Sequence, residues 1–139
     1  MHLSLINTRG QAGLDAPPIT VEVHLSAGLL AFQVVGLGES GSREIRSEVR
    51  PALISSHLKW PDFNITVNLT PAERVTPGTR FDLPIAVGLL VASQQLPADA
   101  IEGRGFIGEL GLDGCLQHAA ARWRLCFAAA RDGTTLCLA

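Results

Sequence analysis

The sequence lacks the groups on which nucleotide hydrolysis usually depends. Lys59 is the only lysine among 139 residues, and no Gly-x-x-x-x-Gly-Lys-Ser/Thr loop occurs. Such a loop holds the β- and γ-phosphates of ATP through its lysine and binds magnesium through the adjacent hydroxyl. We therefore expect no ATP hydrolysis, no catalytic residues and no cofactor in this chain.

Cysteine and histidine are also scarce. Cys115, Cys126 and Cys137 leave one thiol over after pairing and match no zinc-site spacing, which favours reduced thiols and a cytoplasmic protein. A metal site needs three or four converging donors, and the histidines show no spacing that brings two onto one face. We expect no metal site from these four residues: His2, His24, His57 and His118.

A long hydrophobic run is missing too. The longest, Leu83 to Ala92, falls well short of the roughly 20 residues that span a bilayer. Met1 to Gly10 does not have the apolar core and small-residue cleavage site of a secretory signal. These absences predict a soluble protein without a membrane partner.

What the sequence does contain is enough apolar material for one core. Apolar residues make up 47% of the chain and charged residues 17%, so residues 1–139 are predicted to form a single compact domain. The 11 basic and 13 acidic side chains give a net charge of -2, which creates no field that would attract a polyanion to the whole molecule. Any contact with nucleic acid would have to be local.

The pattern of apolar residues predicts an α/β fold. Ile19 to Ser26 and Phe63 to Thr70 alternate as half-buried strands, and Leu30 to Val35 is predicted to return antiparallel as the hairpin partner of the first. Leu3 and Leu5 indicate a shorter strand before them. Asp113-Gly114 indicates a hairpin between Phe106–Leu110 and Cys115–Gln117, and the chain ends in a strand over 134–139.

Three helices are expected between these strands. One covers Glu39 to Leu58, where Pro51 predicts a kink near Ser47 or a break into two pieces. A second, Leu83 to Gln95, is apolar on all sides and should be buried, with Asp82 as its N-cap. The third is alanine-rich, over 119–131, and Gly133 ends it.

Two glycine patterns match the dinucleotide fingerprint Gly-x-Gly-x-x-Gly: Gly36, Gly38, Gly41 and Gly103, Gly105, Gly108. The second leads into a strand and is dismissed. The first follows a strand and begins a helix, yet the expected antiparallel hairpin is not the parallel β-α-β frame that a dinucleotide needs. We favour a turn that starts a helix, with the role of 36–41 left open.

Arg43, Arg46 and Arg50 lie on one stripe of the first helix at spacings of three and four. Such a stripe can neutralise phosphates, but Glu44 and Glu48 are expected on the same exposed side. A solvated, salt-bridged face is favoured over a nucleic-acid site. At most three phosphate contacts predict marginal DNA binding, near 10⁻⁴ M at physiological salt with a salt slope of about -3.

Several stretches resemble the ComM family, also called YifB or magnesium-chelatase-like. The most specific are Arg80-Phe-Asp-Leu-Pro-Ile-Ala86 and Gly108-Glu-Leu-Gly-Leu-Asp-Gly114, and three others occur in the same order: Gly13 to Leu25, Val35-Gly-Leu37 and Asn68-Leu-Thr-Pro-Ala72. The likeness covers nearly the whole chain. It departs from the family where Gly38 replaces the usual proline, where Pro51 interrupts a helix, and over 117–124.

The resemblance implies a parent protein of three parts: this amino-terminal domain, a central AAA+ module that binds ATP and magnesium, and a carboxy-terminal region. The AAA+ module is absent from this chain. Family members act as ring-shaped motors on DNA in natural transformation and recombination. The implied partners are the chain's own AAA+ module, further copies in a ring, and DNA reached through the missing module.

The same resemblance implies a fold like the Lon-protease proteolytic domain, a β-α-β arrangement with a left-handed crossover and a mixed sheet packed by two to three helices. Lon-type enzymes use a serine and a lysine. The shared pattern puts Asp82 at the serine position and Trp123 at the lysine position, so neither catalytic group is present.

The sequence is therefore compatible with three functions. The leading one is a non-catalytic assembly or regulatory domain of a ComM-like ATPase. The alternatives are a weak nucleotide- or nucleic-acid-binding module around 36–41 and the arginine stripe, and a residual Lon-like serine peptidase. Candidate serines for the last exist, but none is paired with a base in the sequence: Ser40, Ser42, Ser47, Ser55, Ser56 and Ser93.

Overall fold

The chain forms a mixed α/β fold, as the sequence predicts. A computed structural model describes residues 2–10, 17–71, 81–114, 116–117 and 135–138. In these ranges a six-stranded sheet has the order β3-β4-β2-β1-β5-β8, and β6 and β7 form a two-stranded sheet. The elements are β1 (His2–Arg9), β2 (Pro18–Ser26), β3 (Ala31–Val35), α1 (Gly38–Ser55), β4 (Asn64–Thr70), α2 (Asp82–Ala92), the 3-10 helix η2 (Ala98–Ile101), β5 (Arg104–Ile107), β6 (Glu109–Leu110), β7 (Leu116–Gln117) and β8 (Thr135–Leu138).

The alternation of β2 and β4 is confirmed. Every second residue of β2, from Ile19 to Leu25, is at most 2% exposed, and Ile65, Val67 and Leu69 of β4 are buried in the same way. The two strands run antiparallel, with Val23 opposite Val67. Because side chains alternate along a strand, this register places both apolar sets on one face of the sheet.

The predicted hairpin between Ile19–Ser26 and Leu30–Val35 is wrong. β3 pairs in parallel with β4, with Val34 opposite Val67, and β4 lies between β3 and β2. The edges of β2 are occupied by β1 and β4, so β3 has no edge of β2 to join. The chain passes from β3 through α1 to β4, which is a parallel β-α-β unit with β3 at the edge of the sheet.

Helix α1 is continuous, so the expected break into two pieces at Pro51 is wrong, while the alternative of a kink near Ser47 stays a prediction. The helix runs from Gly38 to Ser55 with the proline inside it. Val49, Ala52 and Leu53 are buried on both sides of Pro51 in sequence, so core packing holds the helix together. Proline removes only one helical hydrogen bond, the one that would reach Ser47. The exposed position of Ser47 leaves that carbonyl close to solvent.

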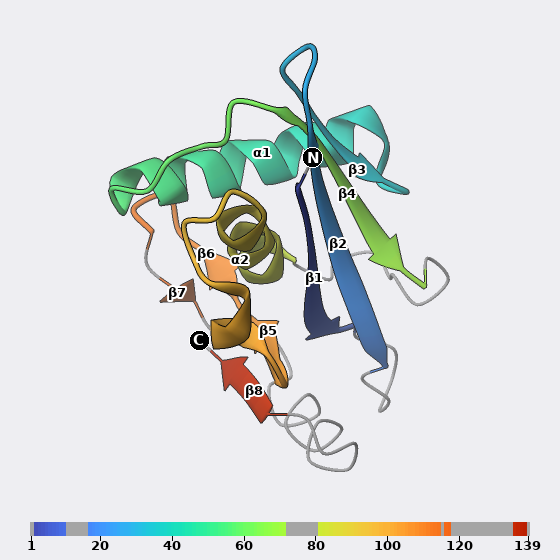
Figure 1. Ribbon diagram of the computed structural model, residues 1–139, viewed down its shortest axis with the longest axis vertical. Coiled ribbons are helices and arrows are strands. Elements are labelled where there is room, and N and C mark those ends of the chain that lie inside the picture. The colour runs from blue at the N-terminus through green and yellow to red at the C-terminus, as the bar shows by residue number, and fades with distance from the viewer. Residues whose placement is uncertain (1, 11–16, 72–80, 115, 118–134, 139) are drawn as a thin grey trace.

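Helix α2 is the central element of the core, as predicted. Ile85 and Leu89 are fully buried, and the helix packs against β1 and β2. Gly88 permits this approach, because a Cβ there would lie 2.5 Å from Cγ2 of Val23. The Ser4 hydroxyl donates to the Gly88 carbonyl at 2.7 Å. Figure 1 shows α1 crossing beside α2, and the two helices are in contact.

The last third adds a parallel edge to the sheet. β5 pairs in parallel with β1 and with β8, while β6 and β7 form the antiparallel hairpin that Asp113-Gly114 predicts. The helix expected over 119–131, Trp123 and most of the loop 71–80 lie outside the described residues. In the described part of the chain, no helix has the length and apolar character needed to cross a membrane. The left-handedness of the crossover stays a prediction.

Candidate functional site

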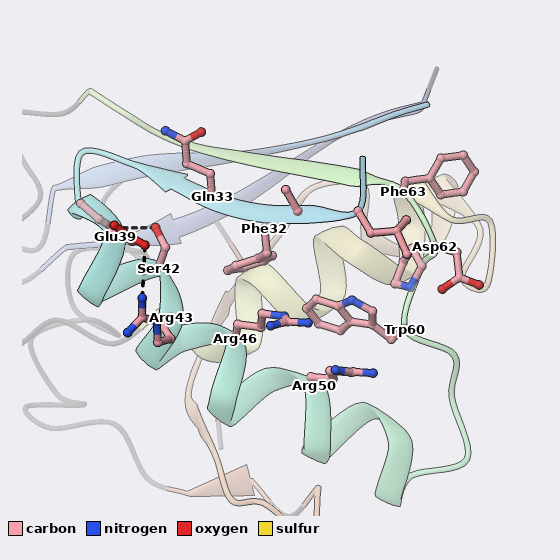
Figure 2. A pocket seen from close by; sticks show the side chains of 14 residues that line it. Phe32, Gln33, Glu39, Ser42, Arg43, Arg46, Arg50, Trp60, Asp62 and Phe63 are labelled. Carbon is pink, nitrogen blue, oxygen red and sulfur yellow. Dashed lines mark hydrogen bonds and ion pairs between the residues drawn. The ribbon is translucent and has the colours of Figure 1, made fainter. Parts of the chain in front are cut away.

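A cleft of about 570 Å³ lies between α1 and the edge strand β3. Its lining comes from three segments that are separate in sequence: the start of β3, one stripe of α1, and the residues just before β4 (Figure 2). The pairing of Ala31 with Asn64 explains the convergence, because it sets residues 60–63 beside the start of β3. The lining residues are Leu30, Ala31, Phe32, Gln33, Gly38, Glu39, Ser42, Arg43, Arg46, Arg50, Trp60, Pro61, Asp62 and Phe63.

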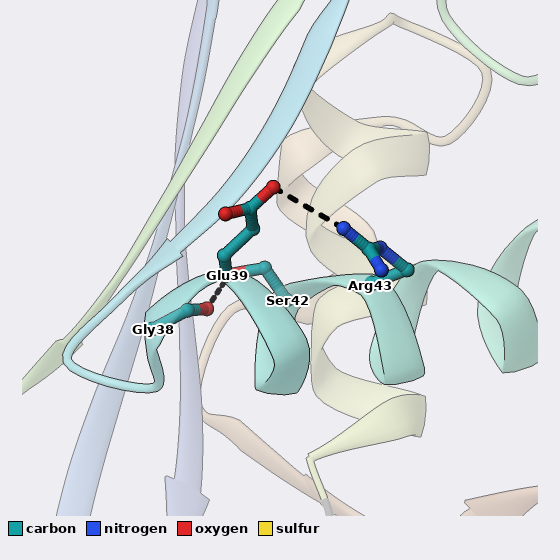
Figure 3. A network of polar contacts seen from close by, with 4 residues as sticks. All are labelled: Gly38, Glu39, Ser42 and Arg43. Carbon is teal, nitrogen blue, oxygen red and sulfur yellow. Dashed lines mark hydrogen bonds and ion pairs between the residues drawn. The ribbon is translucent and has the colours of Figure 1, made fainter.

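The structure brings the three predicted arginines together along this cleft. Arg43, Arg46 and Arg50 are all exposed and all line it. Arg43 forms an ion pair with Glu39, one helical turn earlier, at 3.2 Å between Nη2 and Oε1 (Figure 3). Within the described part of the chain, neither Arg46 nor Arg50 forms an ion pair. Two guanidinium groups therefore face the cleft with their charges uncompensated by a described neighbour.

The acidic residues expected to dilute this stripe are not the ones that line the cleft. Glu44 and Glu48 are absent from its lining, whereas Glu39 and Asp62 belong to it. Helix geometry explains the difference, since Glu39 lies four residues before Arg43 and so shares its stripe, while Glu44 and Glu48 are rotated away. The cleft is lined by three arginines and two carboxylates. Salt bridges were expected along the whole stripe, but among these three arginines only Arg43 forms one with a described residue.

An aromatic pair that sequence reasoning missed forms part of the cleft. The rings of Phe32 and Trp60 lie 5.6 Å apart between centroids, tilted by 49°. Both are partly buried against the core, and Figure 2 shows Arg46 extending toward the Trp60 indole. Phe32 and Trp60 are separated by the whole of α1, so only the parallel pairing of β3 with β4 makes them neighbours. No local pattern in the sequence predicts which strand pairs with which.

Ser42 fixes α1 to β3 at one end of the cleft. Its Oγ accepts a hydrogen bond from the Val34 amide at 2.9 Å and donates to the Gly38 carbonyl at 2.7 Å. The side chain is only 4% exposed. Because Ser42 and Arg43 are adjacent on the helix, this hydroxyl also fixes where the arginine stripe begins relative to the strand.

The first glycine fingerprint has a different context from the one expected. Gly36 and Gly38 have φ values of 97° and 72° and form the turn between β3 and α1, which lies in a parallel β-α-β unit after all. A dinucleotide site also needs an acidic residue at the carboxyl end of the second strand. Asp62 instead precedes β4, at the opposite end from the glycine turn. The interpretation of 36–41 as a turn that starts a helix therefore remains favoured. The reason is the position of Asp62 and not, as expected, an antiparallel strand pairing.

Asp82 begins α2 rather than capping it, which corrects its predicted role. Phe81 occupies the N-cap position without a side-chain hydrogen bond, and Asp82 is the first residue of the helix. The carboxylate is completely buried, and its Oδ2 accepts a hydrogen bond from the Leu110 amide at 3.4 Å. Asp82 thus links α2 to β6. Trp123, which the resemblance to Lon-type proteases puts at the position of the lysine, lies outside the described residues.

The candidate serines are engaged with the backbone. Four of the six donate to carbonyl oxygens: Ser42 to Gly38, Ser47 to Glu44, Ser55 to Leu112 and Ser93 to Leu89. No histidine, lysine or carboxylate accepts from these four hydroxyls in the described residues, so none of the four is arranged as an activated nucleophile.

The histidines do not converge. His2 packs edge-on against Phe63, with centroids 6.1 Å apart. Among the described residues, no three His, Cys, Asp or Glu side chains gather in a way that could hold a metal ion. His118, Cys115 and Cys126 lie outside that part of the chain.

Comparison with known proteins places this chain among magnesium-chelatase-like proteins. Residues 21–138 match the family model described as subunit ChlI of Mg-chelatase. The protein YifB of Escherichia coli strain K12 is 48% identical over 117 residues, which is 84% of this chain and 23% of YifB. The competence protein ComM of Haemophilus influenzae is 45% identical over the same length, 23% of ComM. Rv2897c of Mycobacterium tuberculosis is 32% identical over 121 residues, 87% of this chain and 24% of that protein. The chain spans about a quarter of the length of these relatives.

Proposed function

Because the chain belongs to the family of subunit ChlI of Mg-chelatase and is a relative of YifB and ComM, we propose that it is the amino-terminal, non-catalytic domain of a ComM-like AAA+ ATPase. In this proposal the domain has an assembly or regulatory role, and ATP and magnesium are bound by a separate AAA+ module. Its partners are that module and further copies of the same protein in a ring.

The observation that carries the proposal is the burial of Asp82, which the resemblance to Lon-type proteases puts at the position of the serine. This carboxylate is fully buried and bonded to the Leu110 amide. A carboxylate in that position accepts hydrogen bonds and has no hydroxyl to acylate. The four serines described above donate to backbone carbonyls, which supports a binding role over a peptidase.

A role in DNA processing is the finer part of the proposal. ComM is named a competence protein, and this chain is 45% identical to part of it. We infer that the parent protein acts on DNA during transformation or recombination, and that this domain serves the motor there.

The proposal is tested with a serine-reactive fluorophosphonate probe and a fluorogenic-peptide or casein assay on the 139-residue chain. The expected result is no labelling and no cleavage above a buffer blank, because Ser42, Ser47, Ser55 and Ser93 donate to backbone carbonyls and not to a base. As a control, Ser93→Ala should behave like the parent chain. Labelling that disappears in any one serine variant would refute the non-catalytic role and identify the nucleophile.

A further inference from the structure

We propose that the cleft between α1 and β3 binds a single strand of nucleic acid, with one base stacked on Trp60 and neighbouring phosphates on Arg46 and Arg50. The proposal assigns a binding surface to this domain itself, in addition to any contact made by a motor module. It stands on the cleft alone and does not depend on the assembly role proposed above.

The charge of the cleft fits a phosphate backbone. Arg46 and Arg50 are exposed, line the cleft and have no ion-pair partner within the described residues, while Arg43 is held by Glu39. From Arg46 to Arg50 the helix rises about 6 Å at about 1.5 Å per residue. That rise is close to two steps of a stacked strand at about 3.4 Å each. The stripe therefore has the length to contact successive phosphates.

The aromatic pair fits an unpaired base. Trp60 is only partly buried, packs at 5.6 Å from Phe32, and lies beside the arginine stripe in the same cleft (Figure 2). A basic groove next to an aromatic ring is the arrangement by which proteins hold single strands, since every base has a face that can stack. In a duplex the faces of the bases are already stacked on one another, so a duplex cannot use Trp60 in this way.

The size of the cleft agrees with this occupant. About 570 Å³ is within the range of roughly 300 to 1,000 Å³ that small-ligand pockets occupy. A base with its sugar fits in such a volume, and the rest of the strand would extend along α1. The two carboxylates of the cleft, Glu39 and Asp62, limit the affinity by repelling phosphate.

An acidic peptide is the competing occupant. β3 is at the edge of the sheet, and edge strands can accept an added strand through their backbone groups. Peptide addition would use that edge and the arginine charges but would gain nothing specific from the indole face. The position of Trp60 and Phe32 within the cleft favours the nucleic acid. The experiment below also measures the binding of an acidic peptide.

The stacking part is tested by fluorescence anisotropy of the 139-residue chain with labelled oligo(dT). At physiological salt the dissociation constant should fall in the range of about 10⁻⁶ to 10⁻⁴ M. Binding should be about fivefold to 150-fold weaker for a duplex of equal length, the factor that one stacked base contributes. Trp60→Leu, which keeps apolar volume, should lose a similar factor, while Trp60→Phe should retain most of the affinity.

The charge part uses exposed positions, which leave folding unaffected. Arg46→Ala and Arg50→Ala should each reduce the salt slope by about 0.7, the contribution of one phosphate on a single strand. Arg104→Ala, an exposed arginine on β5 outside the cleft, should leave the slope unchanged. Glu39→Gln should strengthen binding by freeing Arg43, whereas Glu44→Gln makes the same charge change off the cleft and should have no effect.

Five results would overturn the proposal. One is no binding of oligo(dT) at low salt, and another is equal binding of single strand and duplex. A third is an oligo(dT) affinity unchanged in both Trp60→Leu and the Arg46→Ala, Arg50→Ala double variant. The fourth is displacement of oligo(dT) by a polyglutamate peptide whose own affinity is unchanged in Trp60→Leu. That result would make the cleft a peptide site. The fifth is binding of thymidine monophosphate as tight as that of oligo(dT). The ligand of the cleft would then be a single nucleotide and not a strand.

Discussion

Ser42 is the side chain on which the geometry of the cleft most depends. Its hydroxyl is the only described side-chain partner of the Val34 amide, a group buried between β3 and α1. No pattern in the sequence indicates this role, since a serine at the start of a helix is ordinarily exposed or a cap. Only the close approach of the strand to the helix turns it into a link between them.

We predict that Ser42→Ala lowers the free energy of unfolding by about 1 to 3 kcal/mol, because the buried Val34 amide loses its partner. Urea denaturation measures the change. Ser47→Ala removes an exposed hydroxyl of the same helix that bonds to the Glu44 carbonyl, and should stay within about 0.5 kcal/mol. If both variants unfold at the same urea concentration, the Ser42 link does not contribute to stability.

Asp82 is the second residue whose role depends on tertiary structure. We predict that Asp82→Ala destabilises the chain by about 1 to 3 kcal/mol, because a fully buried carboxylate that binds the Leu110 amide is lost. Hydrogen exchange of the Leu110 amide should also accelerate relative to amides of β2. Unchanged thermal and urea midpoints would show that this carboxylate is not structural and would open a functional role for it.

At the scale of the elements, Pro51 gives the clearest case in which packing overrides local preference. An interior proline typically costs a helix about 3 kcal/mol, yet α1 passes through it with Val49, Ala52 and Leu53 buried around it. We predict that Pro51→Ala raises the free energy of unfolding by about 1 to 3 kcal/mol. The gain is the restored hydrogen bond to Ser47, less about 0.4 to 1 kcal/mol for the greater freedom of the unfolded chain.

The Pro51 prediction is checked by the denaturation midpoint, with Ser47→Ala again as a control on the same face of the helix. A midpoint that is unchanged or lower in Pro51→Ala would mean that the proline fits α1 without cost. The proposed binding of oligo(dT) should be retained in this variant, because Arg46 and Trp60 are unchanged.

The elements themselves could largely be predicted from the sequence, but their pairing could not. Alternation located β2 and β4, and the uniformly apolar run located α2, because burial imposes a period on local sequence. Alternation does not say which strand lies next to which, so β3 was paired with β2 instead of β4. The three arginines were found from helical spacing. Phe32 and Trp60 were missed because the pairing of β3 with β4 is what brings them together.

At the scale of the whole molecule, the net charge of -2 conceals a local basic surface. Arg43, Arg46 and Arg50 lie in one cleft with two carboxylates, and the other acidic residues that the structure describes are not part of its lining. Average charge decides long-range attraction, while local arrangement decides contact. A weak and local contact with nucleic acid is therefore compatible with an acidic chain.

The central claim is that this member of the subunit ChlI family has no catalytic machinery of its own and serves an ATPase module. The most direct measurement is ATP hydrolysis by the purified 139-residue chain in the presence of magnesium, with and without single-stranded DNA. The account predicts phosphate release equal to the buffer blank under both conditions, because the sequence contains no P-loop and so lacks its lysine and the adjacent hydroxyl that binds magnesium. Turnover that co-purifies with the chain and keeps a constant specific activity through a second purification would contradict it.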